Sequence, residues 1–265
     1  MVTVRAVIAL AVASYWFIFQ MDVHNVFLQG DLLEEVYMTV PDAFSNQGEC
    51  TKVGHELLII LVYIDDLLVT GSNLSLIKQV RKDLEERFKM KNLGELKYFL
   101  GIEFSRSQKG IIMCQRKYAL ELVSESGLAG GKPATTPLEF NHKLTSVKFD
   151  QLIHGKNATD DAELADKGKF QRLVGRLLYL TTTRSHIAFI VQVLGQHMHA
   201  PKVSHMEAAL RVIRYIKTVL RLGLFMPAGR CQQLVAFCDS DWGSCVETRR
   251  SVTGYVVKFG EALIS

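Results

Sequence analysis

Leu57-Leu-Ile-Ile-Leu-Val-Tyr-Ile-Asp-Asp-Leu-Leu-Val-Thr-Gly71 is the most informative segment of the chain, since it places two adjacent carboxylates between two apolar runs. Each run has the length and the β-branched content of a strand, so the segment predicts a β-hairpin. Asp65 and Asp66 repel each other in such surroundings unless a cation lies between them, and oxygen ligands select Mg²⁺ or Mn²⁺. The alternative is an aspartate pair that caps an exposed hairpin turn, and the spacing alone does not separate the two readings.

A third aspartate lies in a similar apolar segment near the N-terminus. The stretch from Tyr15 to Val23 is rich in aromatic and β-branched residues and predicts a buried strand, in which Asp22 also needs a partner. Carboxylates on neighbouring strands can hold two metal ions about 4 Å apart, one activating an attacking 3′-hydroxyl and the other stabilising the leaving pyrophosphate. Three such aspartates therefore indicate polymerase chemistry.

The rest of the chain combines helical and strand patterns, which predicts the α+β class. Apolar residues recur at helical spacing in 74–90 and 202–220, and segment 3–14 is rich in Ala and free of Gly and Pro. The polar stretch 130–167 is punctuated by Gly and Pro and predicts a linker with at most short helical turns. Further expected elements are a hairpin over 97–115, helices over 116–126, 169–183 and 187–194, and strands over 234–241 and 253–259.

The composition is that of an ordinary globular protein. Hydrophobic residues make up 48% of the 265 residues and charged residues 22%, which excludes a disordered or fibrous chain. The five cysteines include no C-x-x-C pair, which favours a reducing, intracellular compartment, cytoplasmic or nuclear. The alternative is a secretory signal over residues 1–13, but the apolar run continues to Phe19. That run is too short to span a bilayer, so no membrane association is expected.

Positive charge collects in the second half of the chain. The net charge is only +4, but residues 1–52 carry two basic and six acidic groups. A basic stripe on the predicted helix 202–220 could follow a phosphate backbone, or it could be a solvated helix face. The stripe consists of Arg211, Arg214, Lys217 and Arg221.

Three histidines of the second half could suggest a metal site, but histidines at the surface are more common than histidines that bind a metal. His197, His199 and His205 are therefore expected to be surface residues.

Several longer segments occur together in one known family. Gln20-Met-Asp-Val-His-Asn-Val-Phe-Leu-Gln-Gly-Asp-Leu-Leu-Glu-Glu-Val-Tyr-Met38, combined with Tyr63-Ile-Asp-Asp-Leu-Leu-Val-Thr-Gly71, closely resembles the reverse transcriptase of copia-type LTR retrotransposons. The resemblance continues, in the family's order, along essentially the whole chain. Its further landmarks are Lys97-Tyr-Phe-Leu-Gly-Ile-Glu103, Arg172-Leu-Val-Gly-Arg-Leu-Leu-Tyr-Leu180, Cys238-Asp-Ser-Asp-Trp242 and Thr248-Arg-Arg-Ser-Val-Thr-Gly-Tyr255.

The resemblance implies roles for the residues around the catalytic hairpin. Asp22, Asp65 and Asp66 match the catalytic, metal-binding aspartates of the palm. Phe27 matches the aromatic gate that excludes ribonucleotides, and Tyr63 belongs to the Y-x-D-D box. Phe27 and Tyr63 are therefore the expected nucleotide-binding residues, and the implied cofactor is Mg²⁺ or Mn²⁺.

Later segments match the family's nucleic-acid contacts. Leu100, Gly101 and Ile102 resemble the turn called the primer grip, and Asp239 resembles the first metal-binding aspartate of ribonuclease H. The basic helix 202–220 would lie between these two regions. The implied partners are an RNA template, a DNA primer and a dNTP.

The resemblance also predicts the domain organisation. Residues 1–130 correspond to palm and thumb, 131–168 to a linker, 169–230 to a helical connection and 231–265 to the first strands of a ribonuclease H-like domain. Several tens of residues of the family's palm are missing near the junction 52/53, among them a helix that supports template and incoming nucleotide. The later acidic residues of ribonuclease H are also missing. We therefore expect an RNA-directed DNA polymerase fragment that polymerises poorly or not at all, or alternatively a non-catalytic nucleic-acid-binding remnant.

Overall fold

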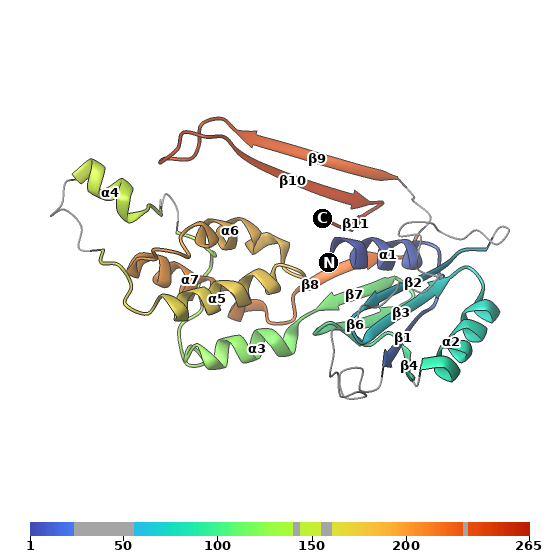
Figure 1. Cartoon of the computed structure of the whole chain (residues 1–265). Coiled ribbons are helices and arrows are strands. Elements are labelled where there is room, and N and C mark those ends of the chain that lie inside the picture. Colours follow the sequence, from blue (N-terminus) through green and yellow to red (C-terminus); the bar gives the residue numbers. More distant parts are fainter. Residues whose placement is uncertain (24–55, 89, 140–143, 155–160, 230–232) are drawn as a thin grey trace, which may run out of the picture.

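The computed structural model describes residues 1–23, 56–88, 90–139, 144–154, 161–229 and 233–265, and it mixes helices with antiparallel sheets (Figure 1). Two sheets and helix α1 (Val2–Ala13) lie at one end of the molecule, and a group of helices lies at the other. A long β-hairpin extends along one side of both. The α+β class predicted from the sequence is confirmed.

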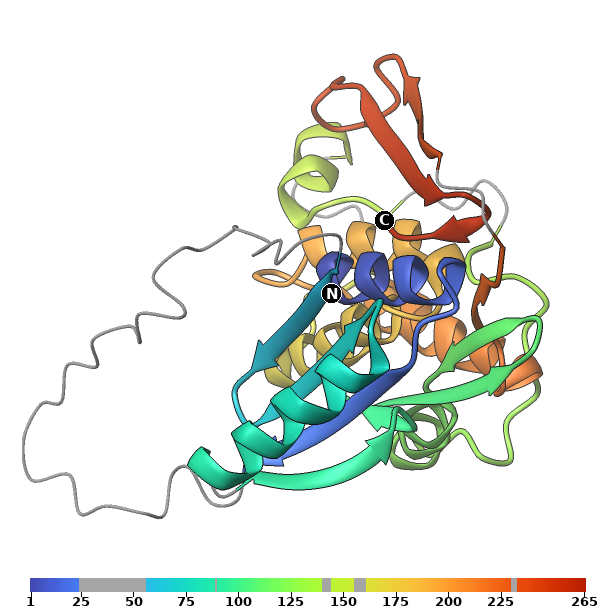
Figure 2. The same cartoon turned by 90° about the vertical axis from the view of Figure 1, so that its right-hand side faces the viewer.

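The first sheet contains the strands that carry Asp22 and Asp66, and the loop with Asp65 joins two of its strands. Its strand order is β2-β3-β1-β4, with antiparallel neighbours. Successive side chains point to opposite faces, and the face that carries Met21, Leu67 and Val69 packs on helix α2 (Figure 2). The elements are β1 (Ile18–Val23), β2 (Leu58–Tyr63), β3 (Asp66–Gly71), α2 (Leu74–Phe88) and β4 (Met90–Glu95).

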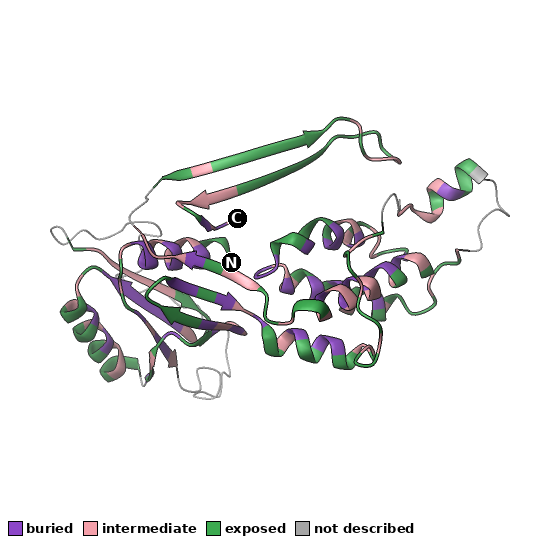
Figure 3. Ribbon diagram, turned by 180° about the vertical axis from the view of Figure 1, so that it is seen from behind, coloured by how far each residue is buried: buried purple, intermediate pink, exposed green. Residues whose placement is uncertain are grey.

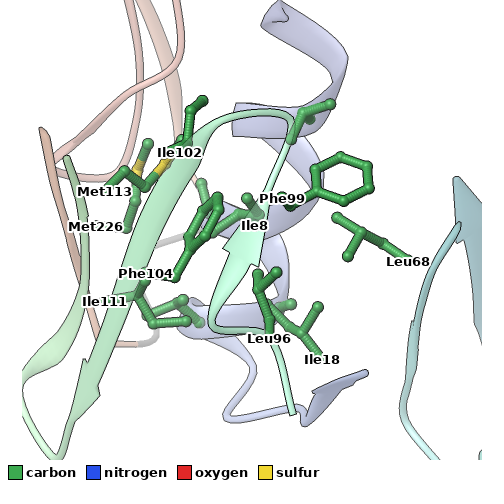
Figure 4. Packing of buried hydrophobic residues seen from close by; sticks show 14 of the residues in the cluster. Ile8, Ile18, Leu68, Leu96, Phe99, Ile102, Phe104, Ile111, Met113 and Met226 are labelled. Carbon is green, nitrogen blue, oxygen red and sulfur yellow. The ribbon is translucent and has the colours of Figure 1, made fainter. Parts of the chain in front are cut away.

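The second sheet has the order β5-β6-β7-β8 and shares a core with α1 and with the other face of the first sheet. Figure 4 shows Ile8 of α1 among Leu68 of the first sheet and Phe99, Ile102 and Phe104 of the second. Each fully buried side chain of this kind stabilises the fold by about 2 kcal/mol. The strands are β5 (Tyr98–Phe99), β6 (Ile102–Ser107), β7 (Gly110–Cys114) and β8 (Gly223–Pro227).

The helices at the other end surround a second core. In α5 the buried residues Phe170, Val174, Leu177 and Leu180 recur at helical spacing and face this core. The Asp166 side chain caps α5 by accepting a hydrogen bond of 2.9 Å from the Lys169 amide. The helices are α3 (Arg116–Glu125), α5 (Lys167–Leu180), η3 (Ser185–Ile187), α6 (Ala188–Gln196), α7 (Val203–Ile216) and η4 (Lys217–Val219).

Two segments differ from the sequence-based expectation. The expected helical connection ends in strand β8, which pairs with β7 and so returns the chain to the second sheet. The linker, in which at most short helical turns are expected, contains the eight-residue helix α4 (Val147–His154). Both elements depend on partners far along the chain, which a local pattern does not record.

The C-terminal strands form a separate sheet of order β11-β10-β9. Figure 3 shows that most of β9 (Leu234–Asp241) and much of β10 (Val252–Phe259) are exposed. After β11 (Ala262–Leu263), Ile264 joins the core around α1, and its carbonyl accepts a hydrogen bond of 3.4 Å from Arg5 Nη1. In the portion of the chain that the structure describes, the helices are too short or too polar to cross a bilayer.

Candidate active site

The antiparallel register brings two of the predicted catalytic aspartates to adjacent positions. Asp22 near the end of β1 pairs with Asp66 at the start of β3. Side chains at directly opposed positions have their Cβ atoms about 5 Å apart and on the same face. Asp65 precedes Asp66 in the loop, and its carbonyl accepts a hydrogen bond of 2.8 Å from the Val23 amide. The three aspartates therefore gather at one end of the sheet.

The hairpin that presents Asp65 has a strained backbone. Tyr63 pairs with Asp66, so only Ile64 and Asp65 form the loop. Ile64 has a φ of +52°, a region that a β-branched residue rarely enters and that costs about 1–3 kcal/mol. Such strain persists where the surrounding fold enforces it, and it concentrates at functional sites.

Burial and like charges act on these carboxylates. Burial raises the pKa of Asp66, and the charges of Asp22 and Asp65 raise it further, whereas a hydrogen bond of 3.3 Å from Gln20 Nε2 acts in the opposite direction. Asp65 Oδ1 is buried, and none of the described residues donates a hydrogen bond to it. A cation among the three carboxylates would relieve both costs.

These donors fit a hard divalent ion, although the described residues do not form a closed metal cage. Carboxylate oxygens suit Mg²⁺ and Mn²⁺. Within the described ranges, no group of three or more His, Cys, Asp or Glu side chains has the arrangement of a metal site. The register therefore supplies the donors, but their side chains do not converge on one point.

A second two-residue turn lies beside this hairpin. Phe99 pairs with Ile102, and the connecting residues Leu100 and Gly101 have φ values of +49° and +71°. We call Leu100 and Gly101 the grip turn. Two consecutive residues with positive φ are typical of a type I′ hairpin. The Leu100 carbonyl accepts a hydrogen bond from the Tyr179 hydroxyl of α5.

Comparison with known proteins identifies the family. A family model described as reverse transcriptase (RNA-dependent DNA polymerase) matches residues 1–55 and 50–140, more than half of the chain. The chain belongs to the reverse transcriptase family.

Several relatives of this chain come from copia-type transposons. The retrovirus-related Pol polyprotein from transposon RE1 of Arabidopsis thaliana is 31% identical over 99% of this chain and 20% of its own length. The Pol polyprotein from transposon TNT 1-94 of Nicotiana tabacum is 26% identical over 100% of this chain and 23% of its own length. The chain thus spans about a fifth of these polyproteins, and the predicted copia-type reverse transcriptase fragment is confirmed.

A shorter relative aligns with this chain over most of its own length. It is an uncharacterized mitochondrial protein of Arabidopsis thaliana, 36% identical over 78% of this chain and 81% of its own length. No solved structure gives a significant match.

The structure describes one of the two predicted nucleotide-binding residues, Tyr63. Phe27 lies outside the described residues. Tyr63 ends β2, directly opposite Asp66, and is 54% exposed. Its ring is therefore accessible beside the predicted catalytic aspartates.

The predicted basic stripe is largely engaged within the chain. Arg211 forms an ion pair of 2.7 Å with Glu139 and a hydrogen bond of 3.1 Å with Thr136 Oγ1. Lys217 donates hydrogen bonds to the carbonyls of residues 128, 129 and 131. Arg214 is half-buried beside Arg211 on a pocket of about 270 Å³, whereas Arg221 is exposed. Phosphate binding along the stripe stays a prediction, and much of the stripe already has a structural role.

Asp239 lies in β9 on the C-terminal sheet, opposite Gly254 of β10. Its side chain is exposed, and its Oδ1 accepts a hydrogen bond of 3.0 Å from the Ser240 amide. The C-terminal hairpin lies apart from the first sheet (Figure 1). The structure therefore does not bring Asp239 together with the palm aspartates.

The expectation that the histidines lie at the surface is wrong for His205. His205 is fully buried, and its ring stacks on that of His197 at a centroid distance of 4.0 Å. Burial, with the nearby His197 and Lys202, lowers the pKa of His205 to about 4. His205 Nδ1 also accepts a hydrogen bond of 3.0 Å from the Lys202 amide. The ring therefore has a structural role at the start of α7.

Two residues that the sequence analysis did not select contact the candidate site. Gln20 is 7% exposed and holds Asp66, and Tyr179 holds the grip turn. Gln20 could have been found, because it lies two positions before Asp22 in an apolar strand and therefore shares its face. Tyr179 lies in the family landmark Arg172–Leu180, but nothing in that segment relates it to Leu100.

Proposed function

We propose that this chain is a metal-dependent RNA-directed DNA polymerase fragment that extends primers poorly or not at all. The register pairing of Asp22 with Asp66, next to Asp65 in the loop, carries this proposal. It supports a site in which three carboxylates hold Mg²⁺ or Mn²⁺. The strained loop at Ile64 and the unpartnered Asp65 Oδ1 are further support.

Each side chain of the site has a task in this proposal. When bound, divalent metal ions activate the primer 3′-hydroxyl and stabilise the leaving pyrophosphate. Asp22, Asp65 and Asp66 supply the anionic oxygens that hold them. Gln20 orients Asp66 through its hydrogen bond, so that one carboxylate oxygen has a fixed direction. Tyr63 contacts the nucleotide or the primer end from its exposed position.

The nucleic-acid partners follow from the family. Reverse transcriptases act on a template and a primer, so we assign an RNA template, a DNA primer and a dNTP as the ligands of this site. Leu100, Gly101 and Ile102 are proposed to contact the primer strand. Asp239 is proposed to belong to the beginning of a ribonuclease H-like domain.

Low activity follows from incomplete positioning. The alignment with the RE1 polyprotein extends over 307 positions, more than the 265 residues of this chain, so the relative contains residues that this chain lacks. The two stretches that match the family model meet at residues 50–55, where the sequence analysis places the missing segment. Catalysis requires reacting groups to be placed within about 1 Å, and a missing support raises the barrier.

The test is extension of a DNA primer on an RNA template with Mg²⁺ or Mn²⁺, combined with Mn²⁺ binding measured by electron paramagnetic resonance. The Asp65→Ala, Asp66→Ala double variant should lose Mn²⁺ binding and any extension. Asp83→Ala is the matched control, because Asp83 is an exposed carboxylate on α2. Mn²⁺ binding that survives the double variant would refute the site, and rapid extension by the wild type would refute the expected low activity.

The alternative is a remnant that binds nucleic acid without chemistry. The exposed Arg221 favours it, although Arg211 and Lys217 are engaged within the chain. This alternative predicts salt-sensitive binding of primer–template that is unchanged by the double variant, together with no extension.

A further inference from the structure

Tyr179 connects the helical end of the molecule to the grip turn. It is the penultimate residue of α5, and its hydroxyl donates a hydrogen bond to the carbonyl oxygen of Leu100. The two residues are 79 positions apart in sequence. Because the acceptor is a main-chain carbonyl, the contact fixes the backbone of the turn directly.

The turn is shaped to receive this hydroxyl. Gly101 has a φ of +71°, which favours glycine, and a Cβ built on it would lie 2.5 Å from the Tyr179 hydroxyl oxygen. Any larger residue would have to displace Tyr179. The close approach therefore requires glycine both for the backbone conformation and for space.

The ring of Tyr179 is itself held in place. The ring of Tyr118 from α3 meets it edge-on, with centroids 4.9 Å apart and planes at 83°. The Tyr118 hydroxyl donates a hydrogen bond of 3.2 Å to the carbonyl of Arg176, and the Arg176 guanidinium lies over the Tyr118 ring and pairs with Glu125. Tyr179 therefore projects from a rigid part of the helical core.

Tyr179 stays protonated, so its hydroxyl can donate the hydrogen bond to Leu100. Burial raises the pKa of Tyr179 above its ordinary value of 10.0, so the hydroxyl keeps its proton at neutral pH. Tyr63 and Tyr98 lie near enough to Tyr179 to interact with it electrostatically, and both are about half exposed. Two accessible tyrosines, one at the end of β2 and one in β5, therefore lie in the surroundings of Tyr179.

We propose that Tyr179 is a positioning residue that fixes the grip turn to the helices and so sets the place of the primer terminus relative to Asp65 and Asp66. This inference rests on the proposed function and deepens it. Without the hydroxyl, the grip turn keeps its pairing of Phe99 with Ile102 but loses its link to α5. The primer strand would then bind with a less defined position of its 3′ end.

Tyr179→Phe is the decisive variant, since it removes only the hydroxyl and keeps the ring against Tyr118. Tyr118→Phe is the matched control, because it removes a hydroxyl from the same helical core without touching the turn. Hydrogen exchange of residues 97–104 in the free chain reports the anchoring. We expect exchange about fivefold faster in Tyr179→Phe, the effect of one ordinary hydrogen bond, and no change in Tyr118→Phe.

A second measurement reads the position of the primer. Fe²⁺ replaces Mg²⁺ at the aspartates, and the hydroxyl radicals it produces with peroxide cut nucleic acid nearby. Wild type and Tyr118→Phe should cut primer–template at a sharp set of positions near the 3′ end, whereas Tyr179→Phe should cut diffusely at equal nucleic-acid occupancy. The Asp65→Ala, Asp66→Ala variant should not cut.

The outcomes distinguish the positioning role of Tyr179 from the proposed function of the site. Unchanged exchange in Tyr179→Phe, or an unchanged sharp cutting pattern, would overturn the positioning role. Absence of aspartate-dependent cutting in the wild type would refute the proposed function, and with it the role of Tyr179 toward the primer. Hydrogen exchange would still decide whether Tyr179 anchors the turn.

Discussion

Lys202→Met is expected to destabilise the chain strongly, because Lys202 is a buried cation between two carboxylates. Its Nζ lies 2.6 Å from Asp150 Oδ2 and 2.9 Å from Asp161 Oδ2, and its side chain is only 5% exposed. Asp150 belongs to α4, and Lys202 directly precedes α7. The ion pairs therefore fasten the segment around α4 to the helical core.

The magnitude follows from what remains after the cation is removed. Loss of one partner from a buried ion pair costs about 3–5 kcal/mol, because the other charge stays buried without compensation. Asp161 keeps hydrogen bonds of 3.0 and 2.7 Å from the Ser204 amide and hydroxyl, and Asp150 keeps one of 2.7 Å from Thr145. We therefore expect about 3 kcal/mol, a large part of the 5–15 kcal/mol that typically stabilises a domain.

The effect should depend on pH. Burial by itself would raise the pKa of Asp150, but hydrogen bonds from Lys202 and Thr145 and the charge of Lys202 outweigh it and hold this pKa below its usual 3.8. A lowered carboxyl pKa contributes stability above pH 3.8, and this contribution is lost as the pH falls through the folded-state pKa. The difference between wild type and variant should therefore shrink below about pH 4.

The assay is urea denaturation followed by circular dichroism at pH 7 and pH 3. Lys167→Met serves as the control, because its ion pair with Glu163 has both side chains 46% exposed and should contribute at most about 1 kcal/mol. Equal losses for Lys202→Met and Lys167→Met at pH 7 would refute the reasoning.

Three further predictions concern single positions. Gly101→Ala and Gly127→Ala both place alanine at positive φ (+71° and +69°), but only the new Cβ at position 101 meets a neighbouring atom. Gly101→Ala should therefore lower the melting temperature more than Gly127→Ala. Equal losses would contradict the contact with Tyr179. Asp66→Asn should raise the melting temperature in metal-free buffer above pH 3.8, because burial and neighbouring charges raise the pKa of Asp66 and so disfavour its ionised form, and the gain should vanish at lower pH. The pKa of His205 is about 4 in the fold against 6.5 in the unfolded chain, so the free energy of unfolding should fall as the pH drops from 6.5 to 4. The difference between the urea midpoints at pH 7 and pH 5 should therefore be smaller in His205→Asn than in the wild type.

Local patterns in the sequence were sufficient to predict most of the elements. Apolar runs rich in β-branched and aromatic residues, before Asp22 and on both sides of the Asp65–Asp66 pair, predict β1 and the β2–β3 hairpin, which the structure confirms. The helix expected over 116–126 is α3, which spans Arg116–Glu125. The family motifs predict Asp22, Asp65 and Asp66 as the catalytic aspartates, because those residue types at that spacing occur together in reverse transcriptases.

Only the tertiary structure decided which of these elements meet. The pairing of Asp22 with Asp66, the approach of Tyr179 to the grip turn, and the burial of Lys202 between its two carboxylates each join segments that are distant in sequence. Side-chain periodicity reports which face of an element is apolar, and it contains no information about the partner on which that face packs. The sequence by itself therefore determined the family and predicted the chemistry of the site, whereas the fold determined which residues hold that site in place.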